Sequence, residues 1–321
     1  MTQKILVTGG AGYVGSTLVP QLLEAGHRVT VLDSLMYNNF QTFLTQVQGY
    51  PIISHPNFTG FVKGDIRDAE IVKQLMPKHD MVIHLAAIVG APACDKHREQ
   101  AETVNLGGTL NLLKHKQEGQ KFIFASTGSN YGKVDTICTE ETPLNPLSVY
   151  GKTKTEAEKA VMEHNGIAYR FATAFGLAPR LRLDLMVNDF IFQAVKNRHL
   201  DVFESDFKRT FIHVRDMAKA FLFGVQNYDN MKGHAFNVGD NKLNYTKREI
   251  AEMIKQKVPE MRLWYNEKLG SDPDQRNYEV SYKKIQGIGP GFFTDISMEQ
   301  GMDELIKTVQ HIEIHNPYNN L

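Results

Sequence analysis

The feature that most constrains the fold is a glycine-rich turn close to the N-terminus. Residues 4–8 (KILVT) form a short apolar run of strand formers, and the glycines of GGAGYVGS follow directly. Apolar residues then recur at helical spacing from Val14 to Leu23. The stretch predicts a strand, a tight turn and a helix. The free backbone N–H groups at the start of such a helix attract anions, so a pyrophosphate can bind there.

The glycine pattern can be aligned in two registers. Gly9, Gly12 and Gly15 give G-x-x-G-x-x-G, whereas Gly10, Gly12 and Gly15 give G-x-G-x-x-G. Either register favours a dinucleotide site over a purely structural turn, because a strand and a helix flank the glycines. The residues expected to contact the cofactor here are Gly9, Gly12, Tyr13, Val14 and Gly15.

Asp33 ends the strand-like run that follows this helix. A carboxylate there can accept hydrogen bonds from the ribose diol of adenosine and repels a 2′-phosphate, so we expect NAD rather than NADP. The alternative is an Asp that only caps a strand end or a helix. Asp65 and Ile66 follow the third strand-like run, where they are expected to face the adenine, although a simple turn explains them almost as well.

Strand-like and helical segments alternate along the first half of the chain. Further strands are expected at 27–33, 58–65, 79–86 and 120–126, with helices at about 65–76 and 97–117. This alternation predicts an α/β fold, a Rossmann-type doubly wound parallel sheet with helices on both faces. The pattern loosens after residue 173. We expect an NAD-binding domain over 1–173, with returning segments at about 212–240, and a smaller C-terminal substrate-binding lobe over 174–321.

The charge balance argues for a small-molecule partner. The 321 residues carry 36 basic and 36 acidic side chains and no basic block, so neither nucleic acid nor a membrane surface is an expected partner. The longest apolar stretch, 81–94, is too short to span a bilayer. Cys94 and Cys138 make neither a disulfide framework nor a metal cluster. We therefore expect no metal and a cytoplasmic location.

The stretch SVYGKTKTE (148–156) opens a predicted helix and holds Tyr150 and Lys154 four residues apart. One turn of helix places such residues side by side. They are either ordinary exposed residues or a phenol held beside a permanent cation. A free tyrosine has a pKa of about 10, and a neighbouring ammonium group favours the phenolate.

The motifs of the chain together resemble the extended short-chain dehydrogenase/reductase family, in its nucleotide-sugar epimerase and dehydratase branch. The resemblance covers essentially the whole chain. It rests on the glycine turn, Asp33, GDIRD, HLAA (84–87), Asn105 in VNLGGT, FAST (124–127), Tyr150-x-x-x-Lys154, RTFIHVRD (209–216), AFNVGD (235–240) and DQRNYEVSYKKI (274–285).

The resemblance implies roles for particular residues. Tyr150 would be the catalytic acid–base and would also lie against NAD, Lys154 would contact the nicotinamide ribose, and Thr127 would hydrogen-bond the reacting sugar hydroxyl. Leu85, Ala86, Ala87 and Asn105 would join the NAD site. The lobe over 174–321 would mainly bind a nucleotide-diphosphate sugar, and Thr127, Asn188, Arg209 and Arg276 would contact it. The helices at 97–117 and 149–165 would form a homodimer interface.

The resemblance also limits the set of expected reactions. In this family the reaction begins with NAD-dependent oxidation at C4 of the sugar. In 4,6-dehydratases an Asp-Glu pair follows the Ser/Thr pair, but Gly128 and Ser129 stand here, which disfavours dehydration. Two reactions remain, 4-epimerisation and net oxidation to a 4-keto sugar, either of which would serve the synthesis of surface polysaccharide or glycan precursors. The chain is also similar to NAD-dependent 4-dehydrogenases of nucleotide-activated heptoses. A 4-reductase is weaker because Asp33 opposes NADP. A noncatalytic dinucleotide-sensing protein is the alternative of another class.

Three further residues carry weaker expectations. His84 and His213 are each expected to be packed, hydrogen-bonded histidines rather than ligands or catalysts. Cys94 follows the fourth strand-like run, so its side chain could line the sugar pocket.

Overall fold

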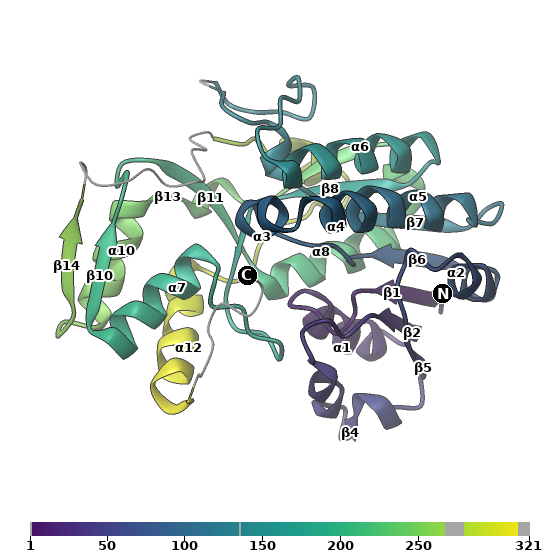
Figure 1. Ribbon diagram of the computed structural model, residues 1–321, viewed down its shortest axis with the longest axis horizontal. Helices are drawn as coiled ribbons and strands as arrows, with labels where there is room; N and C mark the ends of the chain where they lie inside the picture. The colour runs from purple at the N-terminus through teal and green to yellow at the C-terminus, as the bar shows by residue number, and fades with distance from the viewer. Residues whose placement is uncertain (1, 135, 267–278, 314–321) are drawn as a thin grey trace.

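The computed structural model describes residues 2–134, 136–266 and 279–313. A seven-stranded sheet, parallel throughout, forms the larger lobe, with strand order β12-β8-β7-β6-β1-β2-β5 (Figure 1). Its strands are β1 (Lys4–Thr8), β2 (Arg28–Asp33), β5 (Phe58–Lys63), β6 (Met81–His84), β7 (Lys121–Thr127), β8 (Ile167–Phe171) and β12 (Ala235–Val238). The strand order reverses direction between β1 and β6, which is where a doubly wound sheet opens a crevice for ligands.

Helices cover both faces of this sheet because its strands are apolar on both sides. On one face, Ile5 and Val31 pack with α1 (Gly15–Glu24) and α8 (Val214–Gln226). On the other, Leu6 and Phe124 pack with α2 (Ala69–Leu75), α5 (Thr109–Lys114) and α6 (Val149–Glu163). Alternate residues of β1 thus enter opposite layers, as the period of two in a strand requires.

The second lobe lies to the left in Figure 1 and has its own apolar core. Its helices are α7 (Met186–Phe192), α10 (Lys247–Lys257) and α12 (Met298–His311). Its strands are β9 (Thr173–Phe175), β10 (His199–Val202), β11 (Lys208–His213), β13 (Asn244–Thr246) and β14 (Arg262–Tyr265). β11 pairs with β9 and β13 outside the central sheet, whereas β12 returns to that sheet beside β8.

The remaining described elements are short. They are η1 (Phe40–Leu44), β3 (Gln46–Val47), β4 (Tyr50–Pro51), η2 (Ile52–Ser54), η3 (Met76–Lys78), α3 (Ala91–Lys96), α4 (Arg98–Ala101), η4 (Glu102–Gly108), η5 (Gly128–Asn130), η6 (Gln193–Asn197), α9 (Tyr228–Met231), η7 (Asn241–Leu243) and α11 (Lys283–Gln286). In the described ranges no helix is both long and apolar enough to cross a membrane.

Two predicted helices differ from the structure. The helix expected from residue 65 begins at Ala69, because the Asp68 side chain accepts hydrogen bonds from the backbone N–H groups of Glu70 and Ile71 and caps it there. The single helix expected over 97–117 is three segments, α4, the π-helical turn η4 and α5.

Candidate active site

A cavity of about 880 Å³ lies at the carboxyl ends of the central strands, where the strand order reverses. Residues that follow β1, β2, β5, β6 and β7 line it on one side, and α7 and β11 of the second lobe line it on the other. Its volume lies in the range of pockets that enclose cofactors and small ligands. Both lobes therefore contribute to one site.

The glycine turn forms the floor of this cavity, and its geometry selects one register. Gly9, Gly12 and Gly15 line the cavity, whereas a Cβ at Gly10 would meet the Val31 side chain at 2.7 Å. A Cβ at Gly15 would lie 2.4 Å from the Gly9 carbonyl oxygen. Since a Cβ does not fit at Gly10 or Gly15, the backbone of the turn stays open at the N-terminus of α1, so the turn fits a dinucleotide pyrophosphate.

Only glycine fits at position 9, because of its backbone conformation and its close neighbours. Its φ of +72° lies in the left-handed region, and a Cβ there would lie 2.7 Å from the backbone nitrogen of Ala86. The turn after β1 can therefore touch the segment after β6 only without a side chain. Tyr13 and Val14 also line the cavity, as do Leu85, Ala86 and Ala87 after β6.

Asp33 lies at the end of β2 on the cavity wall. Its carboxylate accepts hydrogen bonds from the backbone N–H groups of Ala11 at 2.9 Å and Leu35 at 2.8 Å. Burial raises the pKa of Asp33, and these two bonds oppose that shift. Two backbone hydrogen bonds thus fix the carboxylate on the cavity wall.

The residues after β5 line the cavity next to Asp33. Asp65 forms an ion pair with Arg67 at 2.7 Å, and this hydrogen bond lowers the pKa of Asp65. Ile66 is buried, and a Cβ at Gly108 would meet its side chain at 2.4 Å. Asp65 and Ile66 therefore both contribute to the cavity wall next to Asp33, one with a carboxylate and the other with an apolar side chain.

Asn105 was expected to contact the cofactor, but the structure places it behind the cavity wall. Its amide oxygen accepts from the backbone N–H of Ile88 at 2.8 Å, and its amide nitrogen donates to the Ile88 carbonyl at 2.9 Å. Asn105 thereby holds the loop after β6.

The expectation that Cys94 lines the pocket is wrong, because its thiol is fully buried and donates to the Ile88 carbonyl.

The three expected catalytic residues all line the cavity. Thr127 ends β7, and its hydroxyl accepts from the backbone N–H of Ser129 at 3.2 Å. Tyr150 and Lys154 lie on successive turns of α6, whose first turn is capped by Ser148. The carboxyl end of a strand and the start of a helix therefore bring a hydroxyl, a phenol and an amine to one wall.

Lys154 differs from the permanent cation expected from the sequence. Its side chain is 2 % exposed, and its Nζ lies 3.9 Å from the centre of the Phe124 ring. Burial lowers the pKa of Lys154 to about 7. Its charge at neutral pH therefore depends on nearby anions, and a phenolate at Tyr150 would favour the charged form.

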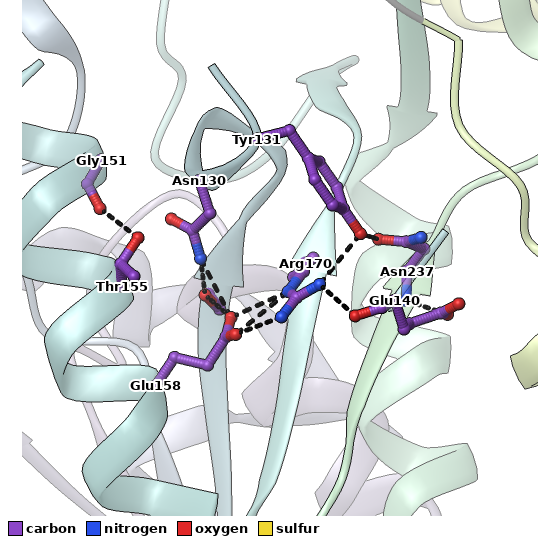
Figure 2. A network of polar contacts seen from close by, with 9 residues as sticks. Asn130, Tyr131, Glu140, Gly151, Thr155, Glu158, Arg170 and Asn237 are labelled. Atoms are coloured by element: carbon purple, nitrogen blue, oxygen red, sulfur yellow. Dashed lines mark hydrogen bonds and ion pairs between the residues drawn. The ribbon is translucent and has the colours of Figure 1, made fainter. Parts of the chain in front are cut away.

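A buried polar network supports this wall from behind (Figure 2). Glu158 lies one turn after Lys154 on α6 and accepts hydrogen bonds from the Ser126 hydroxyl at 2.6 Å and the Asn130 amide at 3.0 Å. Its carboxylate pairs with Arg170 of β8 at 2.6 Å. Because Ser126 precedes Thr127, the network fixes α6 against the catalytic end of β7.

Arg170 extends the network to the far edge of the sheet. Its guanidinium donates to the Tyr131 hydroxyl at 3.0 Å and to the Glu140 carbonyl at 3.1 Å, and the Tyr131 hydroxyl donates to Asn237 of β12 at 2.6 Å (Figure 2). We did not predict this network. The available signals were Glu158 at helical spacing from Lys154 and an arginine inside the apolar strand IAYRF.

The expected substrate residues divide into three groups. Thr127 and Arg209 line the cavity. Asn188 does not, because its amide bonds the backbone of Gly176 and the Arg182 carbonyl. Arg276 lies outside the described residues. Asn188 therefore shapes the loop from Gly176 to Arg182 and is not part of the cavity lining.

The two histidines are packed and hydrogen-bonded, as predicted. His84 bonds the hydroxyls of Thr8 at 2.7 Å and Thr109 at 2.9 Å, and burial lowers its pKa well below the usual value. His213 accepts from the backbone N–H of Arg215 at 3.2 Å, and burial lowers its pKa to about 3. The described part of the chain holds no group of His, Cys, Asp or Glu that could bind a metal ion.

The sequence is similar to a known enzyme family and to individual enzymes over most of its length. The model of the NAD-dependent epimerase/dehydratase family matches residues 5–239. The chain is 29% identical over 335 residues to UDP-glucuronic acid decarboxylase 1 of Danio rerio, covering 99% of this chain and 75% of the relative. It is 27% identical over 280 residues to UDP-glucose 4-epimerase of Streptomyces lividans, covering 80% and 81%.

Solved structures share the fold. UDP-glucose 4-epimerase of Thermotoga maritima with UDP-glucose superposes with a TM-score of 0.80 at 24% identity, covering 95% of this chain and 97% of the other. UDP-glucuronic acid 4-epimerase of Bacillus cereus, in complex with UDP-glucuronic acid and NAD, gives 0.81 at 24% identity, covering 95% and 98%. The expected Rossmann-type α/β fold is confirmed.

Proposed function

Because this chain belongs to the NAD-dependent epimerase/dehydratase family, matched over residues 5–239, we propose that it is a nucleotide-sugar 4-epimerase. The observation that carries the proposal is that Thr127, Tyr150 and Lys154 line the same cavity as the glycine turn. A group that can remove a proton from a sugar hydroxyl thus faces the place where a dinucleotide would lie. The epimerases among its relatives favour UDP as the nucleotide.

The mechanism assigns a separate task to each of these side chains. Bound NAD supplies a reversible acceptor for the C4 hydrogen. Thr127 orients the C4 hydroxyl, and Tyr150 takes its proton during oxidation and returns it during reduction. Lys154 stabilises the phenolate of Tyr150 by its charge. Reduction on the opposite face of the 4-keto sugar inverts C4.

The turn after β7 argues against dehydration as the main reaction. Gly128 and Ser129 stand where a dehydratase would need its acid and base. The carboxylates that line the cavity among the described residues lie elsewhere, at Asp33, Asp65, Asp184 and Asp189. Removal of water from the sugar needs an acid and a base, and the turn beside Thr127 has no carboxyl pair to supply them.

A panel of substrates with two simultaneous readouts tests the proposal. Purified protein is incubated with UDP-, GDP-, CDP- and dTDP-sugars while product NMR and the absorbance of reduced nicotinamide are followed together. Inverted C4 without net cofactor reduction is the expected result. A 4-keto product with stoichiometric cofactor reduction would instead establish a 4-dehydrogenase, and a 4-keto-6-deoxy product would establish a dehydratase.

The Tyr150→Phe variant separates catalysis from binding. It should lower kcat by at least about a hundredfold, since acid–base catalysis typically contributes that much, and leave NAD affinity nearly unchanged. Tyr50→Phe is the matched control, because Tyr50 is exposed and outside the cavity. Bound NAD without turnover of any sugar nucleotide would favour a noncatalytic dinucleotide-sensing protein.

We further propose a homodimer formed through α5 and α6, because Leu110 of α5 is 45 % exposed. Leu110→Asp should therefore shift the mass measured by light scattering from dimer to monomer, and an unchanged mass would place any dimer interface elsewhere. The two cysteines are free, which favours a reducing, cytoplasmic location. We also propose a role in surface polysaccharide or glycan precursor synthesis, because such pathways consume nucleotide sugars.

A further inference from the structure

Two of the motifs in the sequence end in an aspartate that lies outside the cavity. RTFIHVRD (209–216) ends in Asp216, and AFNVGD (235–240) ends in Asp240. Both side chains are buried, with 1 % and 6 % of their surface exposed. A buried carboxylate is costly unless hydrogen bonds satisfy it. The partners of these two carboxylates therefore indicate their task.

Both carboxylates bind the same short segment, which precedes α12. Asp216, in the first turn of α8, accepts hydrogen bonds from the backbone N–H groups of Asp295 at 2.9 Å and Ile296 at 3.1 Å. Asp240, which follows β12, accepts from the Thr294 hydroxyl at 3.1 Å. Burial raises the pKa of Asp216, and its two backbone hydrogen bonds oppose that shift. Three consecutive residues are thus held by two acids from separate elements.

The chain passes from one lobe to the other in this segment, residues 293–297, which we call the crossing segment. Phe292, just before it, lies in the apolar core of the first lobe. Met298, just after it, begins α12 and lies in the core of the second lobe. Lys219 of α8 also donates to the Phe293 carbonyl at 2.9 Å. Helix α8 and the end of β12 therefore hold the chain at its passage between the lobes.

The crossing segment fixes the start of α12, and α12 supports one wall of the cavity. Helices α12 and α7 pack against each other in the second lobe (Figure 1). Ile191 of α7 and Met302 of α12 belong to the same apolar core. Met186 and Phe190 of α7 line the cavity. A displacement of α12 would therefore move the α7 wall and leave the glycine turn of the first lobe in place.

We propose that Asp216 and Asp240 are positioning residues that anchor α12, and through it the α7 wall, to the first lobe, and thereby set the affinity for a nucleotide-sugar substrate separately from that for NAD. The substrate part of this inference rests on the proposed function. The anchoring part does not, because it concerns only how the two lobes are joined. NAD affinity should be nearly independent of the anchor, since the glycine turn, Asp33 and the residues after β6 belong to the first lobe.

Asp216→Asn is the variant that tests the anchoring. It keeps the volume of the side chain, but only one oxygen remains, so at least one of two N–H groups that now bond separate oxygens loses its acceptor. Asp295→Asn is the matched control in the crossing segment. The Asp295 side chain is exposed and pairs with Lys219, and its backbone N–H is the same in the variant.

Urea unfolding measures how firmly the lobes are joined. Trp264 in β14 is the sole tryptophan of the chain, so its fluorescence follows the second lobe, whereas circular dichroism follows the whole chain. In Asp216→Asn the fluorescence midpoint should fall relative to the circular dichroism midpoint, because the second lobe has lost part of its anchor. The control should keep the wild-type separation of the two midpoints. A wild-type separation in Asp216→Asn would refute the anchoring.

Calorimetry measures the effect on the cavity. UDP, GDP, CDP and dTDP are titrated, and the nucleotide that the wild type binds is used for the variants. Asp216→Asn should weaken its binding by roughly tenfold, because the apparent affinity falls with the fraction of molecules that keep the wall in place. NAD affinity should change by less than about twofold. Thr294→Val, which removes only the bond to Asp240, should act in the same direction by a smaller factor.

The outcomes separate positioning from general stabilisation. Equal losses of affinity for NAD and the nucleotide would overturn the proposal, as would an equal loss in Asp295→Asn or an unchanged nucleotide affinity in folded Asp216→Asn. If Asp216→Asn fails to fold by circular dichroism, Thr294→Val replaces it in both experiments, and wild-type behaviour in both would refute the role. If the wild type binds no nucleotide, the proposed function fails, and the urea experiment still decides the anchoring.

Discussion

Glu158→Gln is the substitution that tests most directly how the catalytic wall is supported. Glu158 is fully buried, and its partner Arg170 is 5 % exposed. The variant preserves the volume of the side chain and removes its charge, so the Arg170 guanidinium remains buried without a counter-ion. Breaking a buried pair in this way typically lowers the free energy of unfolding by about 3–5 kcal/mol.

The magnitude follows from the number of contacts that depend on the carboxylate. Its oxygens accept from the Ser126 hydroxyl, the Asn130 amide and two nitrogens of Arg170. A glutamine oxygen can retain some of these bonds, but its amide nitrogen can only donate. At least one donor then loses its acceptor, and an unsatisfied buried donor alone costs about 1–3 kcal/mol.

The matched control is Glu156→Gln on the same helix. Glu156 pairs with Lys159 at 2.8 Å, and both side chains are more than half exposed. Exposed pairs of this kind contribute at most about 1 kcal/mol. The two variants remove the same charge from α6, so their difference isolates the effect of burial.

Urea denaturation followed by circular dichroism measures the free energy of unfolding. Trp264 is the sole tryptophan of the chain and lies in β14, so its fluorescence reports separately on the second lobe. The first lobe should unfold at lower urea in Glu158→Gln, and the double variant Glu158→Leu with Arg170→Met should recover part of the loss. If Glu158→Gln and Glu156→Gln agree to within about 1 kcal/mol, the buried pair does not support the wall.

Three further outcomes are expected. Gly15→Ala should abolish NAD binding in calorimetry, because its Cβ would lie 2.4 Å from the Gly9 carbonyl oxygen, whereas Gly107→Ala, with no atom within 4 Å, should bind normally. Asp33→Asn should lower the ratio of NAD to NADP affinity by about tenfold, or about 1.4 kcal/mol, by removing the charge that repels a 2′-phosphate; an unchanged ratio would contradict that role. Burial lowers the pKa of Lys154 from 10.5 to about 7, so the folded cofactor-free protein binds fewer protons than the unfolded chain between these values. Its stability in thermal unfolding should therefore rise with pH across this window, by at most about 1.4 kcal/mol per unit, and Lys154→Met should lack that rise.

The expectations that depended on local sequence agree with the structure. The strand before the glycines, the helix after them and the capped start of α6 lie where the sequence placed them. The expected enzyme family and its use of NAD are confirmed by the family match over residues 5–239. Such features are accessible because a short segment already contains the residues that turn, cap or alternate.

Expectations about which side chain reaches the ligand were less secure. Asn105 and Asn188 each bond backbone groups behind the wall instead of lining the cavity. Cys94 is closed off by the same loop that Asn105 holds. A polar residue near a cavity either contacts the ligand or supports the loop that does, and the direction of the side chain decides between these roles.

By itself, the sequence determined the Rossmann-type alternation, the glycine turn with Asp33, and the spacing of Tyr150 and Lys154, because each depends on neighbours within a few helical turns or one strand. Only the tertiary structure decided that Glu158 meets Arg170 and that Arg180 reaches Tyr37. Those pairs join separate elements, and the second of them joins separate lobes. Their contacts exist only once the sheet has closed and the second lobe has packed against it.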